Sequence, residues 1–316
     1  MNICFFGSNN ISLSFLKELI KKENDVIVIT QPDKPSNRGL VIKPNIVKNF
    51  CLKNNLPFIT PENLLDKEFI HQILNFNPGL GIVVCYGKIL PQELFSIPKY
   101  GCVNLHFSLL PRYRGPAPIQ WTLINGETKT GVTAFFIDSG IDTGNIILQK
   151  EINIDLKDDF FSLEKKLINI GIDCMFETIQ EIKENRIKTK IINIDKSLPY
   201  ARSLKKIDGK IDWTKSAQDI YNLIRAIKLW PKAFTTYKKD NEYKTIKILD
   251  AEPVYKTFNQ NNQCGEIIDI EKNNGFTVKC GQNFLFIKQV HPENRNIMGA
   301  WDFLLGARLK SGDRFV

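Results

Sequence analysis

Two residues in a short apolar segment, Asn104 and His106, carry side chains suited to chemistry. In a β-strand, residues i and i+2 point to the same face, so this amide and imidazole would lie side by side. The chain after His106 is rich in proline, glycine and arginine, which is typical of a functional loop. A second hydrophobic run at residues 131–137 leads into acidic residues and glycines, and it would bring Asp142 beside the imidazole if the two strands are neighbours. An amide, an imidazole and a carboxylate together suit proton transfer and stabilisation of an oxyanion.

Each of these residues also has a purely structural interpretation. A histidine at a strand end is often held by a hydrogen bond, and Asp142 stands in an Asp-Thr-Gly sequence that favours a turn. The presence of all three residues favours catalysis over these alternatives. Ser108 is not predicted to be a nucleophile, because no Gly-x-Ser-x-Gly sequence surrounds it, and a role in shaping the loop is expected instead.

Size and composition indicate a globular protein of two domains. The chain has 316 residues, of which 43% are hydrophobic and 10% are aromatic, enough to fill packed cores. No apolar run reaches the roughly 18–20 residues that span a membrane, and the N-terminus has no basic signal region, so we expect a cytoplasmic protein. We also expect the protein to be a monomer. The seven cysteines form no Cys-x-x-Cys pair and the three histidines show no metal spacing, which predicts buried reduced thiols and no metal.

The positive charge is concentrated in the last third of the chain. Residues 205–316 contain 19 Lys and Arg against 13 Asp and Glu, whereas residues 1–204 contain 24 against 21. A basic C-terminal part beside a nearly neutral remainder suits a polyanionic partner such as a nucleic acid. The alternative is a general bias of the sequence toward lysine, asparagine and isoleucine, and charge alone does not decide between the two.

Alternating strand and helix patterns predict a doubly wound α/β fold in the first part. Strands are expected at residues 2–6, 25–30, 57–60 and 80–85, and helices at residues 11–22, 44–54 and 66–76. Their continuous apolar strand cores are typical of a buried parallel sheet. The first turn, which begins at Gly7, has neither the Gly-x-Gly-x-x-Gly pattern nor a phosphate-binding Gly-Lys-Ser/Thr, so neither a dinucleotide nor a P-loop nucleotide is predicted.

The second half of the chain has a different pattern. A long amphipathic helix is predicted at residues 160–185, a polar linker follows, and a further helix is predicted at residues 217–227. Short β-rich segments separated by Asn and Gly turns then predict a small antiparallel barrel. These segments are residues 245–249, 265–270, 275–280 and 283–290. The resulting division is a catalytic domain at 1–186, a linker at 187–206 and a C-terminal domain at 207–316.

Three motifs together make the chain resemble the folate-dependent formyltransferases. They are Asn104-x-His106, Ser108-Leu-Leu-Pro-x-Tyr-Arg-Gly115 and Asp138-x-Gly-x-Asp142-Thr-Gly144. Later segments are similar to the same family, so that the resemblance extends over nearly the whole chain. They are Lys210-Ile-Asp-Trp213, Ile224-Arg-Ala-x-x-x-Trp-Pro231, Phe303-Leu-x-Gly-x-Arg308 and Gly312-Asp-Arg-Phe315. The resemblance implies a Rossmann-like formyltransferase domain followed by an OB-like domain that holds tRNA.

The resemblance assigns roles to individual residues. It implies that Asn104, His106 and Asp142 are catalytic, and that 10-formyltetrahydrofolate is the formyl donor. The folate contacts that it implies, partly through backbone groups, are Tyr86, Gly87, Ile89, Leu90, Ser108, Leu109, Leu110, Pro111 and Asp138. Phe107 replaces a usually small residue, and the turn after Gly7 also departs from the family pattern, so the local geometry is expected to differ. Arg112 and Arg114 either hold an acidic or phosphate group or are solvated, and the sequence favours neither.

The implied reaction is direct transfer of a formyl group to an amine. Asn104 would donate a hydrogen bond to the oxyanion of the tetrahedral intermediate, which is typically worth about 10²–10³ in rate. His106 would donate a second hydrogen bond or move protons, and Asp142 would orient His106 and assist proton transfer from the amine. No side-chain nucleophile is needed, because proximity of the two bound substrates lowers the barrier.

Within the family, the chain is most similar to members that formylate the α-amino group of methionine on initiator tRNA. In them a basic loop after the second strand enters the acceptor stem, which would place Lys34, Arg38 and Lys43 on the tRNA. The alternative for this segment is a solvated loop. The alternatives for the whole protein are a sugar-nucleotide N-formyltransferase and a non-catalytic RNA-binding protein, against which the complete set of three catalytic residues argues.

Overall fold

The computed structural model describes residues 1–36, 41–195, 197–240, 242–256 and 262–316. The chain forms two compact units. The first consists of residues 1–118, 129–153 and 164–200, and the second of residues 119–128, 154–163 and 201–316. Residues 119–128 and 154–163 therefore pack with the C-terminal part of the chain, although they precede it in the sequence, so no single boundary along the sequence separates the two units.

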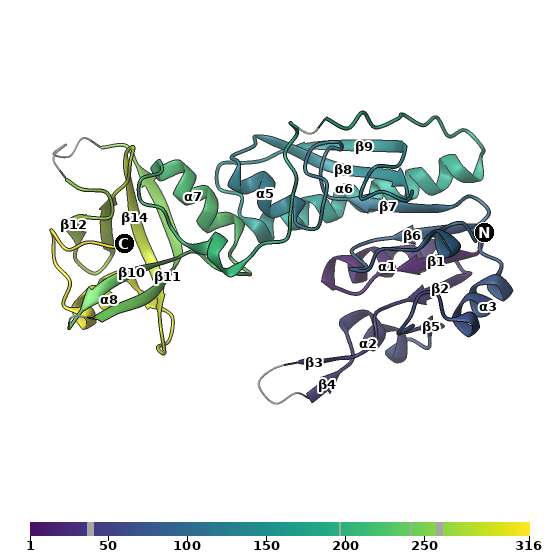
Figure 1. Ribbon diagram of the computed structural model, residues 1–316, viewed down its shortest axis with the longest axis horizontal. Coiled ribbons are helices and arrows are strands. Elements are labelled where there is room, and N and C mark those ends of the chain that lie inside the picture. Colours follow the sequence, from purple (N-terminus) through teal and green to yellow (C-terminus); the bar gives the residue numbers. More distant parts are fainter. Residues whose placement is uncertain (37–40, 196, 241, 257–261) are drawn as a thin grey trace. The chain divides into compact units, whose positions relative to one another are not determined.

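The first unit is built on a seven-stranded sheet in the order β5-β2-β1-β6-β7-β8-β9 (Figure 1). The strands are β1 (Ile3–Phe6), β2 (Val26–Ile29), β5 (Phe58–Ile59), β6 (Leu80–Val83), β7 (Cys102–His106), β8 (Lys129–Phe136) and β9 (Ile146–Asn153). The first five strands in this order are parallel, and β8 and β9 are antiparallel to their neighbours. The chain adds strands outward from β1 in one direction and then from β6 in the other, which confirms the doubly wound topology. Ligands bind in such folds outside the carboxyl ends of the strands at this reversal.

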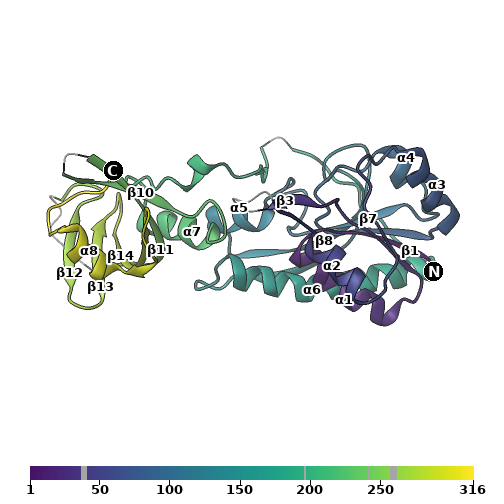
Figure 2. The same ribbon diagram turned by 90° about the horizontal axis from the view of Figure 1, so that it is seen from below.

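Helices cover both faces of this sheet, with α1, α2 and α6 on one side and α3 and α4 on the other (Figure 2). Their bounds are α1 (Asn10–Lys22), α2 (Ile46–Lys53), α3 (Lys67–Phe76), α4 (Gln92–Phe95) and α6 (Phe160–Lys183), whereas α5 (Pro118–Ile124) belongs to the second unit except for its first residue. Because both faces are covered, every residue of β1 is at most 1% exposed and the strands are continuous apolar runs. The side chain of Asn9 caps α1 by accepting a hydrogen bond from the Ser12 backbone N–H at 3.0 Å.

The polar segment after β2 forms a two-stranded hairpin. Strands β3 (Lys34–Ser36) and β4 (Val41–Lys43) are antiparallel, with Lys34 opposite Lys43. The sequence predicted one long loop here, and the pairing shows that six of its residues are ordered by backbone hydrogen bonds instead. Residues 37–40, which include Arg38, lie outside the described residues.

The second unit contains an antiparallel sheet in the order β10-β11-β14-β13-β12, and β15 also pairs with β14. Its elements are η1 (Lys206–Gly209), α7 (Ala217–Ala226), β10 (Phe234–Lys239), β11 (Glu242–Val254), β12 (Ile267–Glu271), β13 (Gly275–Lys279), β14 (Phe284–Pro292), β15 (Met298–Gly299) and α8 (Ala300–Ala307). The last residues of the chain join the two edges of this sheet. The Val316 and Thr236 backbones exchange hydrogen bonds, and Phe315 N–H donates to the Gly265 carbonyl. The predicted small β-barrel is therefore confirmed.

Two predictions from composition concern the state of the cysteines and the presence of membrane-spanning helices. All seven cysteines are free, and burial raises the pKa of Cys4 to about 12 and that of Cys51 to about 11. In the part of the chain that the structure describes, no helix is long and apolar enough to cross a membrane.

Candidate functional site

Strand β7 carries the two residues that the sequence singled out. Asn104 and His106 lie two positions apart on this strand, so their side chains share one face of the sheet. Asn104 is half-buried and His106 is 6% exposed. The strand lies between β6 and β8, next to the reversal of the winding order, which is where a ligand is expected.

The imidazole of His106 has a neighbour at each ring nitrogen. Nε2 lies 2.8 Å from the carbonyl oxygen of Tyr113, and Nδ1 lies 3.7 Å from Oδ2 of Asp142. A carbonyl oxygen can only accept a hydrogen bond. Nε2 therefore carries a proton and donates a hydrogen bond to the Tyr113 carbonyl. Nδ1 is then the nitrogen that can take up or release a proton, and the Asp142 carboxylate faces it.

Asp142 reaches this position through the loop between β8 and β9. Because β8 is antiparallel to β7 and Phe136 pairs with Val103, the end of β8 lies at the start of β7, away from His106. The loop must therefore fold back along the sheet to bring Asp142 to the imidazole. Asp142 has a positive φ of 52°, and its Oδ2 accepts a hydrogen bond from the Gly115 backbone N–H at 2.8 Å. The expected proximity of Asp142 and His106 is thus present.

A glycine is required where this loop rejoins the sheet. A Cβ atom at Gly144 would lie 1.7 Å from the Phe136 carbonyl oxygen, which no side chain can tolerate.

The carboxylate of Asp138 accepts hydrogen bonds within the same loop. Its Oδ1 accepts from the Gly140 N–H at 3.0 Å and from Thr143 Oγ1 at 2.6 Å. Asp138, predicted to contact folate, therefore shapes the loop that presents Asp142.

The loop after β7 is held by its own side chains and carries other predicted folate residues. Ser108 is buried, and its hydroxyl donates a hydrogen bond to the Arg112 carbonyl at 2.7 Å, in agreement with the predicted role in loop shaping. Leu110 is buried and packs in a small cluster, whose other members are Phe135, Ile146 and Ile192. Leu109 and Pro111 are half-buried.

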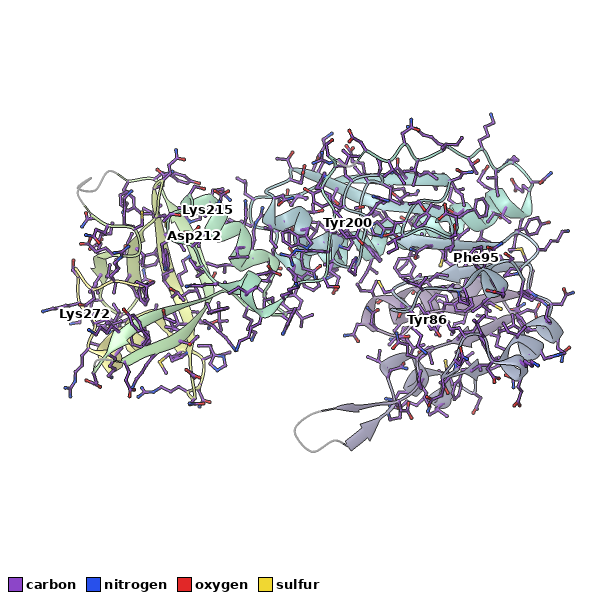
Figure 3. The ribbon with its side chains drawn as sticks, in the orientation of Figure 1. Tyr86, Phe95, Tyr200, Asp212, Lys215 and Lys272 are labelled. Atoms are coloured by element: carbon purple, nitrogen blue, oxygen red, sulfur yellow. The ribbon has the colours of Figure 1, made fainter. Side chains whose placement is uncertain are left out.

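The segment after β6 supplies the remaining predicted folate residues. The Tyr86 side chain is 2% exposed and lies in the core edge-on to Phe6, so only its backbone can face a ligand (Figure 3). Burial also raises the pKa of Tyr86 to about 12. Gly87 is exposed with a φ of +79°, and the Ile89 side chain is 77% exposed, whereas Leu90 is buried in the core. The segment therefore presents one exposed glycine and one exposed apolar side chain.

Phe107 packs into the core of the unit. Its ring lies edge-on to Phe15 of α1, with ring centroids 6.0 Å apart, and it is 3% exposed. The large side chain that departs from the family pattern is thus accommodated between the sheet and α1.

Arg112, for which the sequence left two interpretations open, lies beside an aromatic ring. Its guanidinium is 5.5 Å from the centroid of the Tyr113 ring.

Several functional groups at this site were not predicted from the sequence. The Tyr113 carbonyl and the Gly115 N–H are backbone groups, which carry no signature in residue type. Thr133 of β8 and Gln149 of β9 hydrogen-bond the loop after β7. Thr133 and Gln149 could have been identified only from the strand register, because His106 pairs with Thr133 and Thr133 pairs with Gln149.

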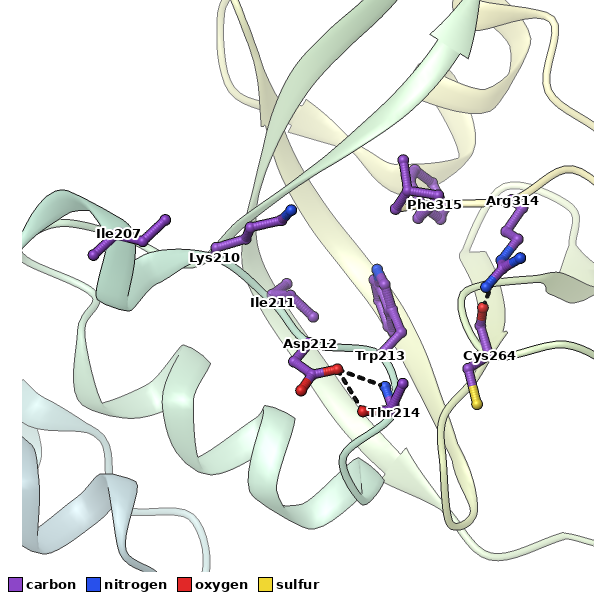
Figure 4. A pocket seen from close by; sticks show the side chains of 10 residues that line it. Ile207, Lys210, Ile211, Asp212, Trp213, Thr214, Cys264, Arg314 and Phe315 are labelled. Carbon is purple, nitrogen blue, oxygen red and sulfur yellow. Dashed lines mark hydrogen bonds between the residues drawn. The ribbon is translucent and has the colours of Figure 1, made fainter.

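A separate pocket of about 440 Å³ lies in the second unit (Figure 4). It is lined by Ile207, Lys210, Ile211, Asp212, Trp213, Thr214, Cys264, Arg314, Phe315 and Val316. The ring centroids of Trp213 and Phe315 are 6.0 Å apart, and both side chains are almost fully buried. None of the predicted catalytic or folate residues lines this pocket.

Comparison with known proteins shows the family of the chain. Residues 1–179 match the formyl transferase family, and residues 203–308 match the C-terminal domain of formyl transferases. The methionyl-tRNA formyltransferase of Endomicrobium trichonymphae is 42% identical, with 100% of each chain covered. That of Thermodesulfovibrio yellowstonii is also 42% identical, with 98% of this chain and 97% of the relative covered.

A solved structure shares the fold over nearly the whole chain. A sugar 3-N-formyl transferase, crystallised in the presence of dTDP and 5-N-formyl-THF, superposes with a TM-score of 0.64. The match covers 94% of this chain and 99% of that one at 24% identity, so the likeness concerns the fold. The family match over more than half of the chain and the full-length relatives lead to one conclusion. The chain belongs to the formyl transferase family.

Proposed function

We propose that this protein transfers the formyl group of 10-formyltetrahydrofolate to the α-amino group of methionine on initiator tRNA. The observation that carries the proposal is the approach of His106 and Asp142 at the carboxyl end of β7, with Asn104 two positions earlier on the same strand face, within a chain 42% identical over its full length to a methionyl-tRNA formyltransferase. The proposal extends to the compartment, the cytoplasm, and to the division in which residues 1–186 perform the transfer and residues 207–316 hold tRNA.

The segment after β6 fits a folate. A pterin ring is flat and largely apolar, and it binds to apolar walls and a few backbone groups. The exposed Ile89 offers such a wall, and Gly87 is exposed in the same segment. When bound, 10-formyltetrahydrofolate supplies a formyl group on nitrogen that an amine can accept directly.

Each of the three residues then has one task. The Asn104 amide donates a hydrogen bond to the formyl oxygen as negative charge develops there. The Nε2 proton of His106 is held by Tyr113, so Nδ1 is the atom that moves a proton between the attacking amine and the departing nitrogen. Asp142, fixed by the Gly115 N–H, keeps the imidazole oriented and stabilises its positive charge.

The acceptor is supported by charge and by the hairpin. Lys34 and Lys43 are opposite each other on β3 and β4, and residues 205–316 carry an excess of basic over acidic residues. Both features suit phosphate contacts along an RNA. We take them to favour tRNA over a small sugar-nucleotide acceptor.

The test is an acceptor-competition assay with the purified full-length protein and 10-formyltetrahydrofolate. Charged initiator Met-tRNA is compared with charged elongator Met-tRNA and with nucleotide-linked amino sugars. We expect selective formylation of the initiator. Turnover with an amino sugar alone would retain the roles of Asn104, His106 and Asp142 but would overturn the acceptor.

A further inference from the structure

A row of three side chains crosses the sheet beneath the catalytic loop. In the β7–β8 pairing His106 is opposite Thr133, and in the β8–β9 pairing Thr133 is opposite Gln149. Residues directly opposite one another in antiparallel strands point to the same face of the sheet. His106, Thr133 and Gln149 therefore lie side by side on one face, and the loop of residues 108–113 contacts this row.

The hydroxyl of Thr133 uses all of its hydrogen-bonding capacity. It donates to the Ser108 carbonyl at 2.7 Å, and it accepts from the Leu110 N–H at 3.2 Å and from Gln149 Nε2 at 2.9 Å. A hydroxyl has one donor and two acceptor positions, so none is left over. Thr133 is 0% exposed, and no water competes for these bonds.

Gln149 completes the attachment from the edge strand. Its Nε2 donates to the Leu110 carbonyl at 3.0 Å as well as to Thr133. The backbone of the loop is thus fixed at Ser108 and at both polar groups of Leu110. The Ser108 hydroxyl then donates to the Arg112 carbonyl at 2.7 Å, and the next carbonyl along the chain, that of Tyr113, accepts the Nε2 proton of His106.

We infer that Thr133 and Gln149 are positioning residues for the transfer, which fix the proton of His106 on Nε2 by holding the loop that carries the Tyr113 carbonyl. They do not touch the reacting atoms. If the loop shifts, the Tyr113 carbonyl moves away and Nδ1 no longer remains the free nitrogen facing Asp142. This inference rests on the proposed formyl transfer for its kinetic effect, but the state of the imidazole can be measured without any substrate.

The experiment compares Thr133→Val with Thr133→Ser in the full-length protein. Valine keeps the shape of threonine but removes the hydroxyl, whereas serine keeps the hydroxyl and removes a methyl group. We expect Thr133→Val to lower kcat by about 10- to 100-fold, with KM for both substrates nearly unchanged. Thr133→Ser should restore most of kcat. A fall of similar size in Thr133→Ser would show that packing of the methyl group matters instead, and it would overturn the inference.

A readout independent of activity is the ring-nitrogen NMR spectrum of ¹⁵N-histidine-labelled protein, which contains only three histidines. We expect the neutral His106 ring to be protonated at Nε2 in the unmodified protein and in Thr133→Ser, and to be a mixture of tautomers in Thr133→Val. Unchanged His106 signals in Thr133→Val would overturn the inference. If the unmodified protein formylates no acceptor but Thr133→Val still changes these signals, the proposed function fails and the positioning role survives.

Two further variants control for folding. Gln149 lies on the exposed edge strand, so Gln149→Leu should fold even if Thr133→Val does not, and it should lower kcat by about threefold to tenfold. Thr178→Val removes an equally buried hydroxyl that donates to the Cys174 carbonyl within α6. It should lower thermal stability and leave kcat and the His106 signals unchanged. Wild-type kinetics and spectra in Gln149→Leu would contradict a positioning role for Gln149.

Discussion

The behaviour of His106 follows from what its two ring nitrogens contact. A backbone carbonyl on Nε2 and a carboxylate on Nδ1 give the ring one fixed donor and one nitrogen available for proton transfer. The carboxylate is itself fixed by the Gly115 N–H, so the orientation of the pair does not depend on a bound substrate. Such preorganisation is what allows a positioned acid–base group to act without reorganisation during the reaction.

The charge of Asp142 can be tested separately from its shape. In Asp142→Asn the side-chain oxygen can still accept the Gly115 hydrogen bond, but the negative charge facing Nδ1 is lost. We expect kcat for formyl transfer to fall by about 10²- to 10⁴-fold, while the melting temperature stays close to that of the unmodified protein. Steady-state kinetics and calorimetry provide the measurement.

The matched control for this variant is Asp66→Asn. Asp66 caps α3 by accepting a hydrogen bond from the Phe69 N–H at 3.0 Å, and asparagine is an equally good cap. The same chemical change at this remote position should leave kcat unaltered. If Asp142→Asn retained more than about a tenth of the activity, the carboxylate would not be needed for proton transfer.

The sequence could place Asn104 and His106 on one face because a strand has a period of two. It could not show that Nε2 meets the Tyr113 carbonyl, because backbone groups depend on the path of the chain and not on residue type. Asp142 was expected beside His106 from strand pairing alone. The pairing itself leads away from His106, and only the backward fold of the β8–β9 loop brings the carboxylate to the ring.

At the scale of elements, the β3–β4 hairpin is anchored at its base. The Asn45 side chain donates to the Gln31 carbonyl at 2.7 Å across the base, and Lys48 pairs with Asp33 at 2.6 Å. The Gln31 side chain also donates to the Tyr86 carbonyl at 2.6 Å, in the segment predicted to hold folate. The hairpin is therefore attached to the carboxyl edge of the sheet at the proposed donor site.

The role of the hairpin in RNA binding can be tested through its charge. In the triple variant Lys34→Ala, Arg38→Ala and Lys43→Ala, we expect KM for initiator Met-tRNA to rise and its dependence on salt to weaken. Each lost phosphate contact should reduce the logarithmic salt slope by about one. The KM for 10-formyltetrahydrofolate should not change.

A second triple variant with the same change in net charge distinguishes contacts made by the hairpin from the electrostatic attraction due to net charge. Lys53, Lys67 and Lys165 are exposed lysines on α2, α3 and α6, and their replacement by alanine should leave the salt slope nearly unaltered. Equal effects of the two triple variants would mean that net charge, not the hairpin, attracts the tRNA.

Whether a helix or strand could be predicted from the sequence depended on how regular its hydrophobic pattern is. The parallel strands and α1, α2, α3, α6 and α7 agree with the sequence prediction within a few residues, because their apolar residues recur at strand or helix spacing. Strand β9 and helix α8 were not predicted. The residues of β9 alternate between half-buried and exposed along most of the strand, and α8 is a short apolar segment in which strand and helix patterns look alike.

At the scale of the molecule, two units divide the proposed work. The sheet of the first unit carries Asn104, His106 and the proposed folate segment, and the barrel of the second carries most of the excess positive charge. The last residues of the chain close the barrel by bonding to the Thr236 and Gly265 backbones at its two edges. Sequence predicted the strands of a barrel but not this closure, because a five-residue terminus has no periodic pattern.

Phe315 is the residue through which this closure can be tested. Its ring is 1% exposed, stacks on Phe276 with centroids 5.7 Å apart and also contacts Tyr237 and Trp213. Replacing a buried phenylalanine by alanine costs about 3–5 kcal/mol, which is a large part of the stability of a small domain. We expect Phe315→Ala to lower the melting temperature of the second unit and to raise KM for initiator Met-tRNA.

The first unit should remain folded in this variant, because it has its own core of buried strands and helices. Binding of 10-formyltetrahydrofolate, measured by calorimetric titration, should therefore persist after tRNA use is lost. Val316→Ala is the matched control, since this side chain is 42% exposed and its backbone bonds to Thr236 are retained. Simultaneous loss of folate binding and of the barrel in Phe315→Ala would show that the two units fold as one cooperative body, and the proposed division of labour would then have no structural basis.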